Sequence, residues 1–522
     1  MSTAKRLISG SLASWVTIGV NMAAQIVLVP IYLNYWDAKT YGIWLAVQAI
    51  MSTLSMLDYG HQNFLAYEFL RLALNDRPAL RKYLWSGIAM GIIISFIQIV
   101  FIVVFIFTGT LAFLLDESST ENSLLLREAG AALLFQGLSW IAFATTPGLM
   151  GRALAAFGYY PRSAWWGVVA AIATTTVPLI AVMMGGDLMA ASIAWFVGSA
   201  LFTIPLYIDY IRLLKKEKLS FVKPSLVLGY DNVKKSLPLL GKSIFENVRQ
   251  QGVRLVLTPM AGPVGLVAFS TMRTGANVAL QGLNTIVNPL VPDLMRFLHA
   301  RDQSRTESAF ATIWILVIAV LAPGIVFLQA IVEPLYVIWT QNKVTFDPLT
   351  FAFLSYGVLV YAVIQPAMAV VIGNNLTKTQ LALTALAAVI VLSVLIASVP
   401  VVGIVGAGAA LLLAEIGAAF GYKTYAKRWL EQNELKWPSK AFQIAIAAMI
   451  IAAVSLGALI VFPEVKWIIL PVSMLLFAWN VRRYWRILPD VAKQNAKGII
   501  KKIPVLSPIL MRIWGKLSRK AL

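Results

Sequence analysis

The chain has 522 residues, of which 59% are hydrophobic and only 13% are charged, and its mean hydropathy is +0.78. Soluble globular chains are about 45–50% apolar and about 25% charged, so this composition excludes a soluble enzyme, a nucleic-acid-binding domain and a disordered scaffold. The net charge of +20 indicates basic cytoplasmic loops and no nucleic-acid partner. Because there is no cysteine and there are two histidines, we expect no disulfide, no metal centre and no cofactor.

Apolar segments of about 20 residues, the length that crosses a bilayer, recur along the chain. We expect an all-α polytopic membrane protein with fourteen transmembrane helices, the first of them a span and not a cleavable leader. The expected spans lie at 11–35, 42–66, 84–108, 130–151, 163–184, 188–211, 237–259, 264–291, 308–332, 350–373, 379–399, 403–422, 441–462 and 467–486.

The lysines and arginines predict how these spans are oriented. With the N-terminus in the cytoplasm and the tail counted from Arg482, 35 of the 43 fall in cytoplasmic segments and 4 fall in outer loops, namely Lys39, Arg127, Lys343 and Lys466. An excess of this kind is the positive-inside signal. Since the number of spans is even, both termini are expected in the cytoplasm.

The longest inner loop, residues 212–235, holds seven basic residues and divides the spans into two halves. A weak internal repeat supports this division, and facing repeats with a site between them are a common transporter design. The expected parts are an N-terminal six-helix lobe (1–212), a basic cytoplasmic linker (213–236), a C-terminal six-helix lobe (237–428), a terminal helix pair (441–486) and a basic amphipathic cytoplasmic tail (487–522). The tail is expected to lie on the anionic inner leaflet, and a simply solvated tail is the alternative.

Ionisable residues within membrane spans are costly and are therefore candidates for function. The first half has Asp58 and His61, both toward the inner end of the second span, where His61 is expected to be solvated. The second half carries the others, which are Lys242, Glu246, Arg249 and Arg254 on the seventh span, Arg273 on the eighth and Glu415 on the twelfth.

Lys242, Glu246 and Arg249 follow one another at spacings of four and three, so they share one helical face. Charged side chains on this face are too costly to expose to lipid, so the face must line a cavity or pack against another helix. Either Glu246 neutralises its neighbours and locks the bundle, or the face is a cationic wall that binds an anionic substrate. On the second interpretation Lys242, Arg249, Arg254 and Arg273 bind substrate, with Arg249 and Arg273 near mid-membrane, about 18 Å and about 14 Å from the ends of their helices.

Three carboxylates are candidates for coupling or gating. Asp58 either caps a helix or pairs with a loop arginine, or else it is an inner gate or a proton-coupling acid. Glu415 follows an apolar run and is either a coupling carboxylate or the partner of an arginine. Glu246, the third, is either such a group or the neutralising partner on its own helix.

Four short motifs resemble a known family, and they are Val29–Tyr32, Thr40–Trp44, Leu57–Gly60 and Pro400–Ala407. Together with the span count and the two-lobed order, they make residues 1–486 similar to Wzx-type polysaccharide and O-antigen flippases of the multidrug/oligosaccharidyl-lipid/polysaccharide (MOP) exporter superfamily. The resemblance implies a flippase, not an enzyme, that moves an undecaprenyl-diphosphate-linked oligosaccharide from the inner to the outer leaflet of the bacterial cytoplasmic (inner) membrane.

The expected partners are this lipid-linked oligosaccharide, membrane lipids, and a polysaccharide polymerase with its assembly proteins. The flippase itself is expected to be a monomer.

Three other functions compete with this interpretation. A multidrug or cation antiporter of the same superfamily would need acidic residues facing its cavity, whereas the spans of the second half are net basic. A lipid II flippase shares the span count and a cationic cavity, but the first span has Asn21 and Gln25 in place of the arginine–aspartate pair associated with that family. A membrane polysaccharide polymerase or glycosyltransferase would normally carry a large outer loop, and the longest outer loop here, residues 109–129, is short.

Overall fold

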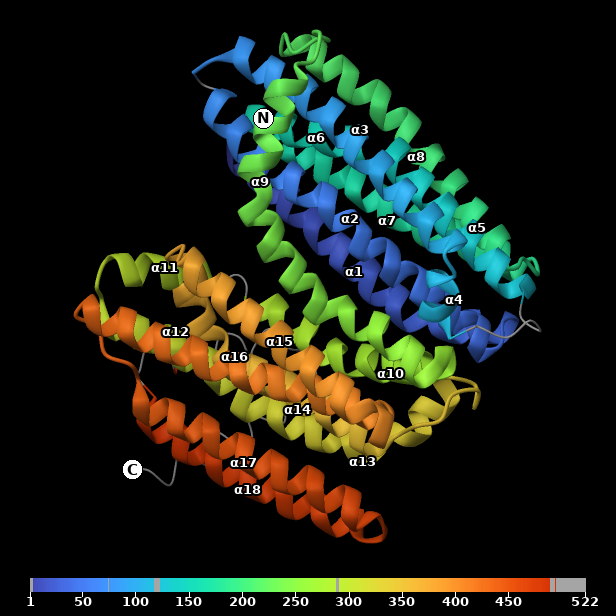
Figure 1. The fold of residues 1–522 in the computed structure, drawn as a ribbon. Coiled ribbons are helices and arrows are strands. Elements are labelled where there is room, and N and C mark those ends of the chain that lie inside the picture. Colours follow the sequence, from blue (N-terminus) through green and yellow to red (C-terminus); the bar gives the residue numbers. More distant parts are fainter. Residues whose placement is uncertain (1–2, 74, 117–122, 288–290, 489–492, 494–522) are drawn as a thin grey trace. The chain divides into compact units, whose positions relative to one another are not determined.

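The computed structural model describes residues 3–73, 75–116, 123–287, 291–488 and 493, and the secondary structure of these residues is exclusively helical. The expected all-α class is therefore confirmed. In chain order (Figure 1) the α-helices are α1 (Thr3–Tyr35), α2 (Ala38–Ala73), α3 (Arg77–Phe107), α4 (Thr110–Leu115), α5 (Ser123–Trp140), α6 (Thr146–Leu154), α7 (Tyr160–Met183), α8 (Leu188–Lys216), α9 (Leu226–Asn247), α10 (Val253–Val287), α11 (Val291–His299), α12 (Gln303–Leu316), α13 (Ala322–Trp339), α14 (Pro348–Gly373), α15 (Thr377–Val402), α16 (Ile404–Gln432), α17 (Ser439–Val461) and α18 (Lys466–Ile487).

Four short π-helices continue these elements, at η2 (Ile141–Thr145), η3 (Ala155–Tyr159), η4 (Val248–Gly252) and η6 (Val317–Leu321). Single π-turns within α-helices are often found at functional sites. One of the four, η4, falls in the seventh expected span, where the sequence predicts polar groups inside the membrane.

Twelve helices in the described part of the chain are long and apolar enough to cross a membrane, so the chain is a multi-pass membrane protein. One of the twelve runs over Leu124–Met183, and its 60 residues suffice for two crossings. Gly158 interrupts this stretch at φ 85° and ψ 14°, backbone that glycine adopts without strain. The seventh expected span falls on the end of α9, on η4 and on the start of α10, before Gly262 interrupts α10 at φ 71°. These two interruptions reconcile twelve long helices with fourteen expected spans.

The chain forms two compact units. Unit 1 comprises residues 1–274, 336–346 and 387–410, and unit 2 comprises residues 275–335, 347–386 and 411–522. These boundaries differ from the expected lobes, because three stretches from the second half of the sequence belong to unit 1. Two of the three include an outer loop predicted in that half, and residues 336–346 lie within another.

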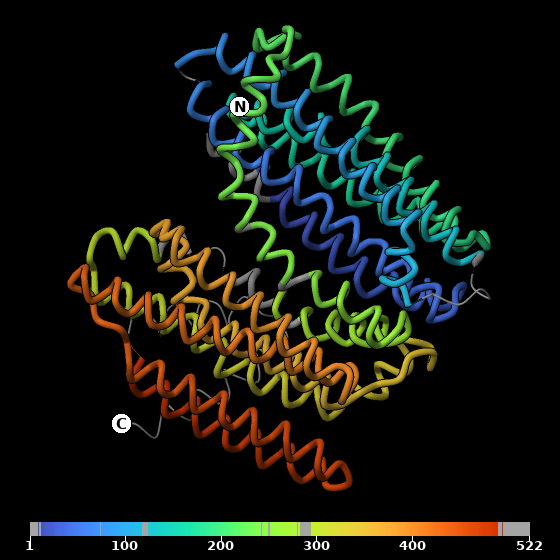
Figure 2. Tube along the Cα trace, in the orientation of Figure 1, coloured from blue at the N-terminus to red at the C-terminus, as the bar shows by residue number. Residues whose placement is uncertain are grey.

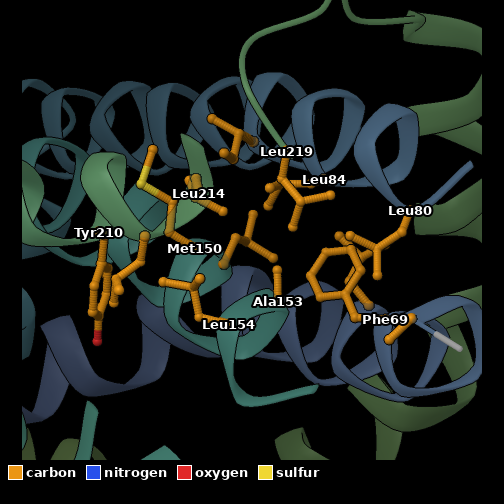
Figure 3. Close-up of a cluster of buried hydrophobic side chains, with 14 of the residues drawn as sticks. Phe69, Leu80, Leu84, Met150, Ala153, Leu154, Tyr210, Leu214 and Leu219 are labelled. Atoms are coloured by element: carbon orange, nitrogen blue, oxygen red, sulfur yellow. The ribbon is translucent and has the colours of Figure 1, made fainter. Parts of the chain in front are cut away.

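In unit 1, α7 packs against α1 and α8, while α2 packs against α3, α5, α6 and α9. Figure 3 shows a hydrophobic cluster that joins α2, α3, α6 and α8, in which Phe69, Leu84, Met150 and Leu214 are buried. Lipid is as apolar as leucine, so inside the membrane such a cluster stabilises the unit through close packing and not through removal of apolar surface from water.

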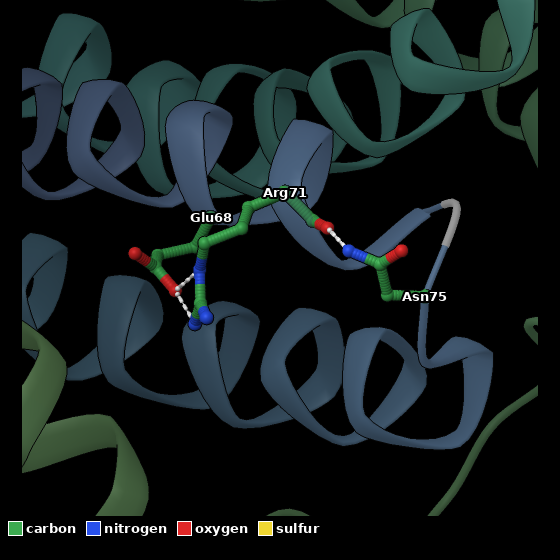
Figure 4. A network of polar contacts seen from close by, with 3 residues as sticks. All are labelled: Glu68, Arg71 and Asn75. Carbon is green, nitrogen blue, oxygen red and sulfur yellow. Dashed lines mark hydrogen bonds and ion pairs between the residues drawn. The ribbon is translucent and has the colours of Figure 1, made fainter.

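The end of α2 is closed by local polar contacts, which Figure 4 shows. Arg71 donates from Nε and Nη2 to Glu68 Oε2 at 3.1 and 2.5 Å, and Asn75 Nδ2 donates to the Arg71 carbonyl at 3.2 Å. The amide of Asn75 satisfies a carbonyl that the helix end leaves without an intrahelical donor. The helix therefore continues to Ala73, beyond the expected end of its span at residue 66.

The expected linker, residues 213–236, is largely helical, because α8 ends and α9 begins within it. The connection between them is fixed to α3, which runs beside α2 in Figure 2. Arg81 donates to the carbonyls of Ser220 and Phe221 at 2.6 and 2.8 Å, and Trp85 donates to the Leu219 carbonyl at 3.1 Å. The basic face predicted for the tail lies outside the described residues.

In unit 2 the terminal helices α17 and α18 form a hairpin (Figure 1), and α17 packs against α12 and α14. Buried polar groups attach this hairpin. Tyr484 donates its hydroxyl to the Ala311 carbonyl at 3.0 Å, and Asn480 Nδ2 donates to the Ile444 carbonyl at 3.1 Å. The terminal pair is thus held by directed bonds as well as by apolar contact.

Candidate functional site

Asp58 of α2 is a fully buried carboxylate at the centre of a polar cluster in unit 1. Its Oδ2 accepts hydrogen bonds from Gln62 Nε2 at 2.6 Å, Thr145 Oγ1 at 2.8 Å and Trp140 Nε1 at 3.2 Å. Its Oδ1 is buried without a hydrogen-bond partner in the described structure. Asp58 lies in the middle of α2 and caps no helix, so one of the two structural roles considered for it does not apply.

A half-buried arginine lies one amide away from this carboxylate. Arg152 Nη1 donates to Gln62 Oε1 at 2.7 Å and to the Gly148 carbonyl at 3.2 Å, and Nη2 reaches Asn63 Oδ1 at 3.3 Å. Gln62 therefore donates to Asp58 with its nitrogen and accepts from Arg152 with its oxygen. The close approach needs glycine at 148, because a Cβ there would lie 2.5 Å from Gln62 Oε1.

Local chain geometry brings α5 and α6 to Asp58. Pro147, the second residue of α6, has no N–H and cannot bond to the carbonyl one turn earlier, and the π-helix η2 ends two positions before it. The wider turn places both Trp140 and Thr145 against Asp58. Ser95 of α3 supports Thr145 from the other side, with 2.7 Å between the two hydroxyl oxygens.

His61 lies one turn from Asp58 and is also buried, with Nε2 at 3.2 Å from the Gly87 carbonyl and no partner for Nδ1 among the described residues. The expectation that His61 is solvated near a helix end is therefore wrong, since α2 continues for three further turns. Gly91 faces the free oxygen of the carboxylate, because a Cβ there would lie 3.4 Å from Asp58 Oδ1. Two buried, partly unsatisfied polar groups thus lie between α2 and α3.

The polar seventh span contacts α2 through Asn247. This residue is 3.0 Å from Thr53 Oγ1 and 3.4 Å from Ser52 Oγ. Glu246, one position earlier, is exposed. The side chains of Lys242 and Arg249 lie outside what the structure describes, so the face that they share with Glu246 keeps both of its interpretations.

The remaining candidates are placed on two helices, α10 and α16. Arg254 of α10 is half-buried, with Nη1 at 3.3 Å from Gln251 Oε1 and with Nε buried and unpartnered among the described groups. Arg273, also of α10 and in unit 1, and Glu415 of α16, in unit 2, are both half-buried. Among the described residues no group of acidic, histidine or cysteine side chains could hold a metal ion.

Arg152 and Gln62 are the residues that sequence reasoning missed. Gln62 follows Asp58 by four positions on a helix, which is a readable contact signal. Arg152 gives no such signal, because it stands directly after the expected end of the fourth span, where a basic residue is expected in the following inner loop. Continuation of the helix through α6 and η3 carries it into the polar cluster instead.

No family model and no curated protein matches the sequence. Solved structures do match the fold. A lipid II flippase, MurJ, in an inward closed conformation is 14% identical, with a TM-score of 0.68 over 92% of this chain and 99% of that chain.

Two other transporters of the MOP superfamily also match. An inward-facing multidrug resistance transporter of the MATE family is 11% identical, with a TM-score of 0.58 over 80% of this chain and 95% of that chain. A transporter from Pyrococcus furiosus, described by the reverse polarity of its binding pocket, is 14% identical, with a TM-score of 0.53 over 82% and 96%. The chain therefore has the fold of these transporters, and none of the three neighbours is an enzyme.

Proposed function

We propose that the protein is a flippase that moves a diphosphate-linked, lipid-anchored oligosaccharide from the inner to the outer leaflet by alternating access. The observation that carries this proposal is the likeness to the lipid II flippase, which extends over almost the whole of both chains. A substrate with a lipid tail, a diphosphate and sugars needs cationic groups at membrane depth, and the second half of this chain supplies them.

The proposed substrate-binding residues are Lys242, Arg249, Arg254 and Arg273. A guanidinium presents a planar fork of donors that matches two phosphate oxygens at once, whereas an ammonium acts as a point charge. The buried Nε of Arg254 supports this role, because it holds donor capacity that no described protein group uses.

The proposed coupling or gating carboxylates are Asp58, Glu246 and Glu415. Asp58 has the strongest support, since burial disfavours its charge while three donors and Arg152 favour it. A carboxylate held between such opposed effects changes its charge in response to small rearrangements of its partners. Movement of α6 relative to α2 would remove Thr145 and the arginine together.

We place the protein in the bacterial cytoplasmic membrane with both termini inside, from the distribution of basic residues. In this orientation the substrate enters from the side that carries the basic loops. Its partners would be the enzymes that build the glycan and a polymerase that consumes it outside.

A reconstituted flipping assay tests the function. Purified protein in liposomes should transfer a fluorescent undecaprenyl-diphosphate oligosaccharide between leaflets, and the same lipid without its diphosphate should not move. Lipid II as a third probe distinguishes a peptidoglycan precursor from other glycans. Loss of a surface polysaccharide in a deletion strain, with lipid-linked repeat units retained on the inner leaflet, would support the same conclusion in cells.

A cation antiporter of the same superfamily is the second candidate. The likeness to a MATE transporter and the buried carboxylate of Asp58 favour it. Proton-driven uptake of organic cations into inverted vesicles, without transfer of the diphosphate lipid, would select this candidate and reject the flippase.

A further inference from the structure

Residues 336–346, which we call the strap, comprise the last turn of α13 and most of its connection to α14. They belong to unit 1, although the flanking residues on both sides belong to unit 2. The strap is predicted to lie in an outer loop of the second half of the sequence. Three of its side chains donate hydrogen bonds to α1, the first helix of the chain.

The first contact repairs a defect that proline makes in α1. Pro30 has no N–H, so the Ile26 carbonyl one turn earlier has no intrahelical donor. Trp339 Nε1 of the strap donates to this carbonyl at 2.6 Å. A side chain from the second half of the sequence thus completes the hydrogen bonding of a helix in the first half.

Two further contacts close the end of α1. Gln341 Nε2 donates to the Pro30 carbonyl at 3.0 Å, and Lys343 Nζ donates to the Leu33 carbonyl. Carbonyls in the last turn of a helix lack intrahelical donors and carry partial negative charge, so an ammonium is favourable there. Three donors of the strap therefore hold three carbonyls along the last three turns of α1.

The strap is also tied to α10. Tyr336, which is buried, shares a 2.6 Å hydrogen bond with the buried Thr271. The start of α2 also meets α10, eight positions before Thr271. A Cβ on Gly42 would lie 2.2 Å from the carbonyl oxygen of Pro263. Only glycine permits backbones to approach this closely.

We propose that the strap is an outer latch, which joins α1 to α10 while the substrate site is open to the other side and which must release once in each transport cycle. The proposal rests on the proposed function, because only alternating access requires the ends of α1 and α10 to separate. The contacts suit a latch, since all three donors reach backbone carbonyls of α1 near the exposed end of the helix. Such bonds exchange with water at little cost once the strap lifts.

Release can be measured without substrate, because the chain has no native cysteine. A single Thr271→Cys reporter beneath the strap should react slowly with a thiol reagent. Adding Gln341→Ala and Lys343→Ala removes two of the three latch bonds and should raise the labelling rate about 5- to 30-fold. A Thr203→Cys reporter, buried fifteen positions into α8, should keep its rate in both backgrounds.

Cross-linking tests the need for release. Asn34→Cys with Lys343→Cys, two exposed positions, joined by a short bifunctional thiol reagent that a reductant cleaves, should stop transport, and reduction should restore it. Thr108→Cys with Thr110→Cys is the control, because its hydroxyls lie 2.7 Å apart within one outer turn and join no two helices across the strap.

Normal transport by the cross-linked latch, or equal labelling of Thr271→Cys with and without the two alanines, would overturn the latch. Failure of the unmodified protein to flip any diphosphate lipid would instead overturn the proposed function. The labelling experiment uses no substrate, so its result would still show whether the strap opens.

Discussion

Asp58 of α2 and Arg152 of α6 are joined through a single amide, which donates to the carboxylate at 2.6 Å and accepts from the guanidinium at 2.7 Å. Because the amide belongs to Gln62, a gain or loss of charge at Asp58 changes the bond that orients Arg152. Hydrogen bonds therefore couple α2 and α6 in addition to apolar packing. Polar networks of this kind respond as a unit.

Gln62→Ala should destabilise the protein. The change removes one donor from a buried carboxylate and one acceptor from a half-buried guanidinium, and the loss at the buried carboxylate costs about 1–3 kcal/mol. Thermal unfolding in detergent measures the effect. Asn63→Ala is the matched control, since its bond to Arg152 is 3.3 Å long and lies at the exposed surface, and it should shift the midpoint little. Equal effects of the two substitutions would contradict the bridging role of Gln62.

Asp58→Asn should abolish transport that a proton gradient drives, because an amide of the same shape cannot take up or release the proton. Exchange of substrate down its own gradient should persist, and protein abundance should stay unchanged. Liposomes with and without an imposed pH difference separate the two activities. Gradient-driven transport at the normal rate in Asp58→Asn would exclude this carboxylate as the coupling acid.

Arg273→Lys and Arg254→Lys should impair flipping, and alanine at either position should impair it more. Lysine keeps the charge but loses the planar fork that matches phosphate, and alanine loses both. Initial rates with the diphosphate lipid measure the effect, with abundance measured in parallel. Normal rates in the alanine variants would show that these arginines do not bind the substrate.

Single cysteines should map the orientation of the chain, which has none of its own. Cysteine at Lys39 or Lys466 should react with a membrane-impermeant reagent from outside, whereas cysteine at Lys82 or Lys235 should react only after the membrane is opened. Labelling of the second pair from outside would reverse the topology and place the strap on the inner side.

Tyr484→Phe should loosen the terminal helix pair. The hydroxyl donates to a buried carbonyl of α12, and its loss leaves that carbonyl short of one donor at a cost of about 1–3 kcal/mol. A lower midpoint of thermal unfolding with unchanged transport is expected, because Tyr484 lies outside the proposed substrate site. A transport defect at full stability would give the terminal pair a part in transport.

The sequence indicates the carboxylate at the centre of the candidate site, Asp58, but not the arginine beside it, Arg152. A carboxylate within a span is costly wherever it lies, so the sequence alone indicates Asp58 as a candidate, without its partners. Its partners come from α2, α5 and η2, and only helix packing brings Trp140 and Thr145 to it. Arg152 was hidden for a different reason, since a basic residue near the end of an apolar segment is usually solvated and here the helix carries it inward.

The sequence by itself determined that the chain is an all-helical, multi-pass membrane protein, because bilayer thickness and the cost of bare backbone in lipid leave few alternatives to long apolar helices. Tertiary structure decided which residues cooperate. The strap of residues 336–346 joins α1 across about 300 positions of sequence, and no local pattern announces that Trp339 completes the hydrogen bonding left open by Pro30. Periodicity and composition act over neighbouring turns, whereas a contact of this range depends on how whole helices pack.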